Sequence, residues 1–396
     1  MISADEALAR VLSDVAPTGD ERVGLCAALG RVLRVPVSAR APLPAFDHSA
    51  MDGYAVAVAG FTGEGPWSLP VRGESQTGGE APPLAPGAAC RVFTGAQLPE
   101  GADAVVMQES VERDGATARF RERPRPGDHV RRAGEDLAVG AVGLAAGTRL
   151  GPGQLGLAAA LDCADLVVAR RPLVTIVCTG DELRAPGAPA RAGSIPDANG
   201  PALAAMVALV GGLPRLAPFA RDRRTDVDAA LRDALESSDL VLTVGGVSVG
   251  DHDFVRPALE AAGVALDFWK VRIKPGKPLA FGRRGARRVL GLPGNPVAAQ
   301  LTFALFGAPL LRAMQGDVAP VAPRRHARLS VALRHGPGRQ GFLRASWDGT
   351  LVTPLANQAS GAPTSMAWAN CLVVVPAECE GYEAGAEVEV LALADL

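Results

Sequence analysis

The sequence predicts a multidomain α/β plus β protein, with one mostly parallel sheet and two parts rich in short strands. Three observations lead to this fold class. The chain has 396 residues, which is more than one hydrophobic core usually holds. Residues 171–318 alternate strand-like and helix-like segments, a pattern typical of a parallel sheet covered by helices on both faces. Residues 36–133 and 319–396 contain short Val-rich runs separated by Pro and Gly, which indicates β structure.

The first half of the chain is predicted to hold a β-rich domain inserted into a helical part. Residues 3–15 predict a helix, because Ser3 and Glu6 have capping-box spacing and the apolar residues that follow share one face. Residues 151–169 return to helix-like composition. The strands expected between these helices are Tyr54–Val58, Ala89–Phe93 and Ala104–Glu109, with a hairpin turn at Asp114-Gly115.

The second half is predicted to be an α/β unit followed by a small barrel or sandwich. In the α/β unit, the expected strands are Leu173–Cys178, Leu216–Ala220, Asp239–Val244 and Val289–Leu292. The expected helices begin after Asn199, near Thr225 with Asp228 in capping-box position, at Val255 and at Pro296, the last reaching Met314. In the tail, Cys371–Val375 and Glu387–Leu391 are strand-like, and Asp348-Gly349 marks a hairpin.

Overall composition excludes several classes of function. The formal net charge is −2, so the chain does not depend on bulk attraction to nucleic acid or to an anionic membrane. No uninterrupted apolar run reaches membrane length, and the N-terminal segment is acidic and amphipathic. We therefore expect a cytoplasmic protein with no membrane and no nucleic-acid partner.

The cysteines and histidines do not form a recognisable metal site. No Cys-x-x-Cys pair occurs, and no Cys/His spacing resembles a zinc site. A disulfide framework is not expected in a chain of this length, which favours a reducing compartment. Any bound metal would therefore have oxygen ligands, which suits Mg²⁺.

Three loops that follow predicted strands of the α/β unit carry glycines and polar residues. They are Cys178–Glu182, Thr243–Asp253 and Gly291–Pro296. Open α/β sheets bind ligands beyond the carboxyl ends of their strands, and glycines let backbone N–H groups approach an anion. Each loop alone could be a tight turn, but three in one unit favour a phosphate-bearing ligand. The spacing of a Walker A loop or a dinucleotide fingerprint is absent.

Lysine is nearly missing from the chain, except in one place. Of the 40 basic residues, 37 are Arg, and the three lysines, Lys270, Lys274 and Lys277, fall within eight residues. Alternation along a strand would put Lys270, Arg272 and Lys274 on one face. The alternative is a solvated edge strand with protective charges. Because the chain otherwise uses Arg for solvated charge, as in the predicted hairpin tip Arg283–Arg288, we interpret these lysines as functional.

Acidic residues occur beside the same loops. Asp181, Glu182 and Asp253 lie in the loops, and Asp222 follows the second predicted strand. Carboxylates near bound phosphates usually indicate Mg²⁺ or proton transfer, although Asp181 could be a simple turn residue. In the β-rich domain, Asp52-Gly53 could be a hairpin turn, and Arg131–Asp136 could be a surface linker.

Seven segments, taken in order, resemble the molybdopterin molybdenumtransferase family, the MoeA and gephyrin E-domain type. They run from residue 46 to residue 296, and both flanks have the expected character, so the resemblance covers nearly the whole chain. Around Asp197-Ala198-Asn199-Gly200 and Asn357–Gly361 the chain departs from the family's usual residues. The matching segments are FDHSAMDGYAV, VFTGAQLPEGADAVVMQE, RRAGEDL, TGDEL, GGVSVGDHDF, FWKVRIKPGKPLAFG and GLPGNP.

The resemblance implies four domains and a homodimer. The implied domains are a helical dimerisation domain, an inserted β-rich domain, a MogA-like three-layer α/β domain that binds molybdopterin, and a C-terminal β barrel. On this sequence, they correspond to residues 1–35 with 134–170, 36–133, 171–318 and 319–396.

The resemblance also implies a reaction and the residues that perform it. The family cleaves adenylated molybdopterin with Mg²⁺ or a similar ion, releases AMP and inserts molybdenum from molybdate into the dithiolene. A transient contact with a MogA-like adenylyltransferase is expected. Asp52 and Thr94 are expected to close the cleft from another domain, from the same or the partner subunit. By motif position, the catalytic residues are Asp52, Thr94, Asp136, Glu182, Asp222, Lys270, Lys274 and Lys277. The ligand-cradling residues are Thr179, Gly180, Gly245, Gly246, Ser248, Gly250, Pro293, Gly294, Asn295 and Pro296, and the metal ligands are Asp253 and Glu182.

Two other functions are compatible with parts of the sequence. A molybdopterin adenylyltransferase shares the α/β domain, but its usual form lacks the inserted β domain and the tail. A non-enzymatic molybdopterin-binding scaffold is the second alternative, and the lack of a long disordered linker argues against it.

Overall fold

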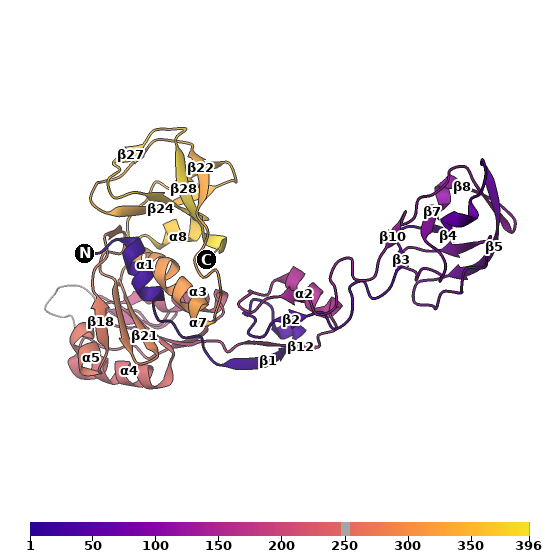
Figure 1. Ribbon diagram of the computed structural model, residues 1–396. Coiled ribbons are helices and arrows are strands. Elements are labelled where there is room, and N and C mark those ends of the chain that lie inside the picture. Colours follow the sequence, from indigo (N-terminus) through magenta and orange to yellow (C-terminus); the bar gives the residue numbers. More distant parts are fainter. Residues whose placement is uncertain (247–253, 396) are drawn as a thin grey trace.

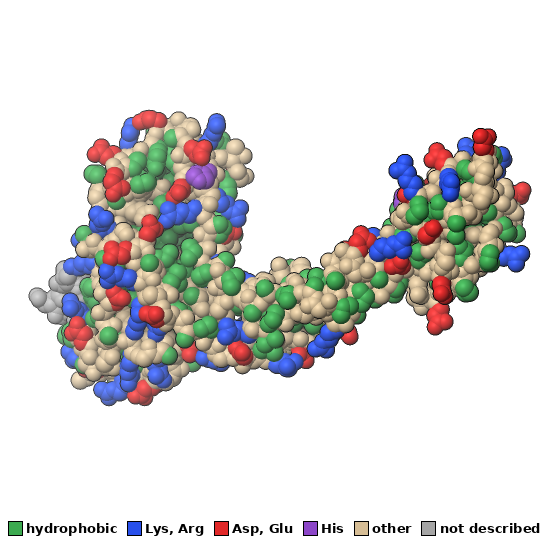
Figure 2. Space-filling model, viewed as in Figure 1, with side chains coloured by type: hydrophobic (Ala, Val, Ile, Leu, Met, Phe, Trp, Pro, Cys, Tyr) green, Lys and Arg blue, Asp and Glu red, His purple; other side chains and the backbone are tan. Residues whose placement is uncertain are grey.

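The computed structural model describes residues 1–246 and 254–395, and the chain is strongly elongated (Figure 1). A large body at one end contains the α/β sheet and the C-terminal β part. A smaller β unit lies at the other end, and a narrow middle part joins the two (Figure 1). On the face shown in Figure 2, acidic and basic side chains are intermixed, as expected for a chain with a net charge near zero.

The α/β part is built on a six-stranded, mostly parallel sheet, as predicted. The first four strands in the sheet order are parallel, and the fifth is antiparallel to both of its neighbours, so only that strand runs in the opposite direction. In order, they are β16 (Leu213–Leu216), β13 (Leu173–Cys178), β17 (Leu240–Val244), β21 (Arg287–Leu292), β20 (Ala280–Arg284) and β18 (Ala265–Phe268).

Alternating side chains of these strands pack into two cores, one on each face of the sheet. Ile176 and Leu242 belong to one core, and their neighbours Val177 and Val241 belong to the other. This alternation is what a strand buried on both faces requires, so the three-layer arrangement is confirmed. One face is covered by α3 (Asn199–Leu209), α6 (Pro296–Thr302) and α7 (Ala308–Met314), and the other by α4 (Arg224–Ser237) and α5 (Val255–Ala261).

Three details of the α/β unit differ from the prediction. The second strand ends at Leu216, and Ala220 makes only a single parallel bridge to Thr179. Asp228 does not cap α4, because its carboxylate accepts a hydrogen bond of 2.8 Å from Nε of Arg224 instead. A π-helical turn, Phe303–Gly307, interrupts the last helix. That helix, 296–314, is long and apolar enough to cross a membrane, but 78% of its most apolar window is buried inside the protein.

The N-terminal helix α1 (Ala4–Leu12) packs onto the α/β unit. The predicted capping position is confirmed, since Oγ of Ser3 accepts a 3.1 Å hydrogen bond from the Glu6 N–H. Ala7 and Val11 are fully buried in the same core as α7. The helix therefore lies with the α/β sheet and not with the other flank of the β-rich part.

The middle part of the molecule contains less helix than predicted. Only α2 (Pro152–Ala160) is α-helical in the 151–169 segment, and Asp165–Ala169 forms strand β12, which pairs with β1 (Asp20–Gly24). The expectation of helix through residue 169 is wrong because Leu166 and Val168 are buried while β1 supplies the hydrogen-bonding partner. A second strand pair joins β2 (Val37–Ser38) and β11 (Val142–Leu144). The boundaries of the four domains stay a prediction.

The distal unit is a six-stranded sheet that contains the three predicted strands and the predicted hairpin. The sheet order is β7 (Ala104–Met107), β4 (Gly53–Val56), β6 (Ala89–Val92), β5 (Trp67–Ser75), β9 (Thr117–Phe120) and β8 (Val111–Asp114). The C-terminal strands close into a barrel, because the first and last of them, β24 and β26, also pair. Around the barrel they are β24 (Gln340–Trp347), β25 (Leu351–Pro354), β22 (Arg325–Leu329), β28 (Glu387–Ala392) and β26 (Cys371–Val375).

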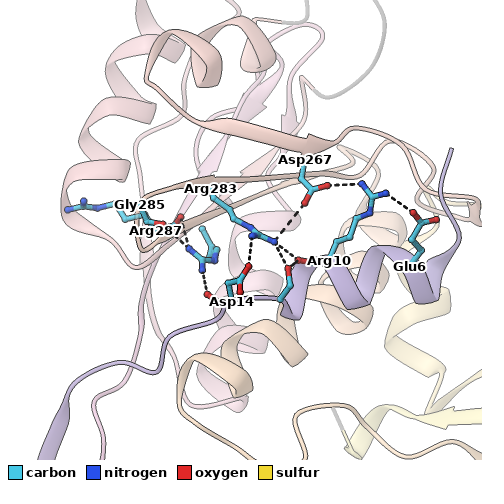
Figure 3. Close-up of polar contacts among 9 residues, drawn as sticks. Glu6, Arg10, Asp14, Asp267, Arg283, Gly285 and Arg287 are labelled. Atoms are coloured by element: carbon cyan, nitrogen blue, oxygen red, sulfur yellow. Dashed lines mark hydrogen bonds and ion pairs between the residues drawn. The ribbon is translucent and has the colours of Figure 1, made fainter.

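The predicted hairpin tip around Gly285 is present, but it is not simply solvated. Strands β20 and β21 form the hairpin, and Arg288 is only 5% exposed. Arg283 donates a hydrogen bond to the Arg10 carbonyl in the last turn of α1 (Figure 3). Arg288 donates one to the carbonyl of Asp14, two residues beyond that helix. The sequence could not reveal this because the two partners are more than 260 residues apart in the chain.

Candidate active site

A cleft of about 870 Å³ lies at the carboxyl ends of β13, β17 and β21. Thr179 and Gly180 follow β13, and Gly245 and Gly246 follow β17. The third loop contributes Pro293, Gly294, Asn295 and Pro296. The structure therefore brings the described parts of the three predicted loops into one cleft. Ser248 and Gly250 lie outside the described residues.

Only glycine fits at the two positions after β17, because of close contacts and of the backbone conformation. Gly245 and Gly246 have φ angles of 88° and 62°, values that L side chains rarely adopt. A Cβ on Gly245 would lie 2.9 Å from Oγ1 of Thr179, and one on Gly246 would lie 2.6 Å from Val255. The loop after β17 thus lies so close to Thr179 and Val255 that a side chain on either glycine would clash with them.

The Gly-Asn-Pro loop lies at the start of α6, as predicted, and it also contacts the C-terminal part of the chain. Asn295 occupies the N-cap position of α6 and Pro296 begins that helix, as predicted, but the Asn295 side chain does not cap it. Its Nδ2 instead donates to Oγ of Ser360 over 3.0 Å, and the Val297 N–H donates to the Ser360 carbonyl over 3.1 Å. The loop is thus tied to the C-terminal part of the chain.

Sequence reasoning assigned no role to two polar residues of the cleft, Asp197 and Asn199. Asp197 is 6% exposed and accepts backbone hydrogen bonds from Asn199 and Gly200, of 2.9 and 3.0 Å, at the start of α3. Nδ2 of Asn199 donates to the Gly294 carbonyl over 2.7 Å. This pair therefore holds the third loop in place. The Asp-x-Asn-Gly pattern before a helix was the available signal.

The C-terminal part also contributes to the cleft, through Gly361 and Pro363. This segment is held by Arg344, whose side chain is almost fully buried. Its guanidinium donates to Oγ of Ser365 and to the Ala359 carbonyl, both over 3.2 Å. Burial lowers the pKa of Arg344, as expected for a charged group removed from water. The role of Arg344 is thus to support the wall of the cleft.

Two of the predicted carboxylates, Glu182 and Asp222, line the cleft. Both side chains are exposed, and Oδ2 of Asp222 lies 3.4 Å from the Asp181 N–H. A Cβ on Gly180 would meet the Glu182 carboxylate at 2.4 Å, so glycine lets this carboxylate fold back over the loop. Within residues 1–246 and 254–395, no cationic side chain pairs with either group. Asp253 lies outside the described residues.

The lysine segment (residues 270–277) lies beside the cleft. Regular strand structure is limited to β19 (Ile273–Lys274), but the predicted alternation is present, since Val271 and Ile273 are buried while Arg272 and Lys274 are exposed. Pro278, the residue after Lys277, lines the cleft, whereas none of the three lysines does. Nothing in the described chain forms an ion pair or a side-chain hydrogen bond with them.

The other three predicted catalytic residues are far from the cleft within one chain. Oδ1 of Asp52 accepts hydrogen bonds from the Thr94 N–H and Oγ1, of 2.7 and 2.8 Å, beside β4 in the distal sheet (Figure 1). These bonds lower the pKa of the Asp52 carboxyl, the backbone bond most. Asp136 pairs with Arg131 at 2.6 Å in the loop leading back toward the middle part. Asp52 and Thr94 are therefore in direct contact, whereas their part in closing the cleft stays a prediction.

Models of three protein regions match the chain and together cover most of it. The MoeA N-terminal region (domain I and II) matches residues 2–161. The model described as "Probable molybdopterin binding domain" matches residues 175–313, which include the cleft loops. The MoeA C-terminal region (domain IV) matches residues 326–393.

The similarity to known proteins and solved structures extends over nearly the whole chain. A molybdopterin molybdenumtransferase of Haemophilus influenzae is 35% identical, with 98% of each chain covered. Molybdopterin molybdenumtransferase 2 of Mycobacterium tuberculosis is 37% identical over 93% of this chain and 94% of its own. A crystal structure of the MoeA molybdopterin biosynthesis protein of Pyrococcus horikoshii superposes with a TM-score of 0.81 at 31% identity, covering 99% of both chains. The chain therefore belongs to the molybdopterin molybdenumtransferase (MoeA) family.

Proposed function

We propose that this protein transfers molybdenum from molybdate to molybdopterin and releases AMP from adenylated molybdopterin, using the cleft beyond β13, β17 and β21. The observation that carries the proposal is the convergence of three glycine-containing loops, two carboxylates and a neighbouring lysine segment at one sheet edge. Both substrates are anions, so a site for them needs N–H donors and mobile positive charge. The full-length similarity to molybdenumtransferases supports this function over that of an adenylyltransferase.

The loop backbones are proposed to hold the phosphate groups. Gly245 and Gly246 line the cleft in successive left-handed conformations, which curve the backbone of the loop after β17. Such backbone concavities bind anions through N–H groups. Asn199 and Asn295 restrain the Gly294 loop from two sides, so this part of the binding surface is formed before the ligand arrives.

The lysines are proposed to bind the charge that the loops do not neutralise. Lys274 and Lys277 are exposed and have no acidic partner in the described chain. An ammonium that lacks a partner remains available to phosphate or molybdate. A lysine is also a compact and mobile charge, whereas a guanidinium is planar and needs more space.

The carboxylates fit a hard divalent cation, and we propose Mg²⁺. Glu182 and Asp222 present oxygen donors from two loops to the same cleft, and no described cation neutralises them. Asp253 is the third proposed ligand by motif position. When bound, Mg²⁺ neutralises pyrophosphate charge and polarises its phosphorus toward water. The protein's own part is to hold the pyrophosphate on the loops while water cleaves one P–O bond of the P–O–P bridge. One phosphate leaves as AMP, the other stays on the molybdopterin, and the dithiolene of that molybdopterin takes molybdenum from molybdate.

Asp52, Thr94 and Asp136 require a second subunit or a large domain movement to reach the cleft. We propose a homodimer in which the distal sheet of one subunit approaches the cleft of its partner. Several exposed apolar side chains of the middle part, including Leu29, Val139 and Val142, would be covered by such an assembly. A transient contact with a MogA-like adenylyltransferase, which would supply the labile adenylate, and a cytoplasmic location are part of the same proposal.

Incubation of the purified protein with adenylated molybdopterin and molybdate tests the proposal. We expect AMP release that depends on molybdate and a divalent cation. ATP-dependent formation of the adenylate would indicate an adenylyltransferase instead. Tight binding of adenylated molybdopterin without AMP release would indicate a scaffold.

A further inference from the structure

The N-terminal arm (residues 2–14) contacts the lysine segment directly. Ile2 pairs with Val271 as a parallel bridge, and the Arg272 N–H donates to the Ile2 carbonyl over 2.9 Å. On the other side, the Gln340 N–H of β24 donates to the Arg272 carbonyl over 2.9 Å. The backbone that carries the lysines therefore lies between the first residues of the chain and the C-terminal barrel.

A second contact joins the arm to the same stretch of chain just before Lys270. NH1 of Arg10 donates to Oδ1 of Asp267 over 2.9 Å, and NH2 of Arg10 donates to Glu6 over 2.6 Å (Figure 3). Asp267 is in β18, three residues before Lys270. The arm thus holds the stretch that leads into the lysine segment at two points, one by backbone pairing and one by an ion pair.

The arm is itself firmly attached to the α/β unit. Ala7 and Val11 of α1 are fully buried. NH2 of Arg283 donates to the Arg10 carbonyl over 2.7 Å and to Oγ of Ser13 over 2.6 Å (Figure 3). NH2 of Arg288 donates to the Asp14 carbonyl over 2.6 Å. A rigid helix anchored at its C-terminal end can fix the backbone that it contacts.

We propose that the N-terminal arm positions the lysine segment for its anionic substrate, and that Arg10 is a positioning residue for Lys270 and Lys274. The inference rests on the proposed function. The lysine side chains have no ion-pair partner in the described chain, so their placement depends on their backbone alone. Small displacements of binding groups reduce substrate affinity, which makes the support of that backbone functionally important.

Arg10→Met breaks the contact with Asp267, and Arg324→Met is its matched control. Arg324 also contacts α1, through Asp5 at 3.3 Å, but it does not touch the lysine segment. The two arginine side chains are similarly exposed, at 42% and 39%, and both substitutions remove one positive charge. Arg10→Lys keeps the charge opposite Asp267 and serves as the conservative variant.

The first measurement is amide hydrogen exchange of the peptide spanning residues 267–277. We expect about tenfold faster exchange in Arg10→Met than in the wild type, and wild-type exchange in Arg324→Met and Arg10→Lys. The second measurement is steady-state kinetics with molybdate. We expect KM for molybdate to rise about fivefold in Arg10→Met, with kcat changed less than twofold, and recovery in Arg10→Lys.

Two results would overturn the positioning role. One is equal exchange of the 267–277 peptide in Arg10→Met and Arg324→Met. The other is faster exchange with an unchanged KM and an unchanged Kd for molybdate, the latter measured by calorimetry. Failure of the proposed function would give a different result. The wild-type protein would then release no AMP, while the hydrogen exchange of the variants could still be compared.

Discussion

Asn295 of the Gly-Asn-Pro loop donates a 3.0 Å hydrogen bond from Nδ2 to Oγ of Ser360 in the C-terminal part of the chain. Gly361, the residue after Ser360, lines the same cleft as Asn295. The cleft is therefore formed by the α/β unit together with the segment that precedes α8 (Pro363–Trp368). This side-chain bond and the backbone bond from the Val297 N–H to the Ser360 carbonyl connect the two.

Ser360→Ala is expected to weaken substrate binding more than it weakens the fold. The lost bond is between neutral, exposed groups and contributes about 1 kcal/mol. We expect a two- to tenfold increase in KM, in proportion to that energy (~1 kcal/mol), with a small change in the free energy of unfolding. The control is Ser330→Ala, which removes a similar bond of 2.7 Å to Thr353 in the barrel. An equal KM increase in both variants would contradict a specific role of Ser360.

Lys274→Arg tests whether the site needs the shape of the ammonium group as well as its positive charge. Because Lys274 is exposed and has no partner in the described chain, the variant should change the free energy of unfolding by less than about 0.5 kcal/mol. The rate of molybdenum insertion should fall at least about tenfold, since the planar guanidinium cannot take the position of the ammonium. Arg272→Lys, on the same exposed face, is the control. Insertion at the normal rate in Lys274→Arg would show that only the charge is needed.

Thr94→Val is expected to raise the pKa of Asp52. The backbone N–H of Thr94 is the largest cause of the lowered pKa and remains in the variant, whereas the hydroxyl bond is lost. The pKa should therefore move upward without reaching its ordinary value. A carboxylate with a lowered pKa stabilises the fold above its unfolded pKa, and this contribution is lost as the pH falls through the folded pKa. Carbon NMR titration of the carboxyl, assigned with Asp52→Asn, measures the shift. An unchanged or lower pKa would contradict the assigned bond.

Cys178 is expected to be unreactive in the folded protein although it lines the cleft. Burial, and to a smaller extent the nearby Asp197, raise its pKa to about 12, so the reactive thiolate is scarce at pH 8. Cys26 is exposed and should react first with iodoacetamide. Mass spectrometry of native and unfolded samples identifies the labelled positions. Labelling of native Cys178 as fast as Cys26 would contradict its burial.

The cleft loops could be predicted because their signals are local. Each loop directly follows a buried strand, so its place at the carboxyl edge follows from the alternation of strands and helices. The glycines after β17 are likewise recognisable, because only glycine accommodates their conformation and close contacts. The hairpins also follow from short-range turn patterns. Those patterns left a barrel and a sandwich equally open for the tail, because closure depends on the pairing of β24 with β26.

The features that sequence reasoning missed depend on contacts between distant residues. Arg283 and Arg288 have the composition of a solvated turn, and only the packed α1 gives them partners. Asp165–Ala169 is compatible with helix until β1 supplies its hydrogen bonds. Asn199 reaches Gly294, 95 residues away in the chain, through tertiary folding alone.

AMP release by cleft variants tests the central claim most directly. Glu182→Gln and Asp222→Asn change only carboxylates that line the cleft, and Asp233→Asn changes a surface carboxylate paired with Arg215 at 3.1 Å. Each purified protein is incubated with adenylated molybdopterin, molybdate and Mg²⁺, and AMP is quantified. The wild type and Asp233→Asn should release AMP at the same rate, and each cleft variant should be at least about a hundredfold slower. Wild-type rates in both cleft variants would contradict the assignment of the active site to this cleft.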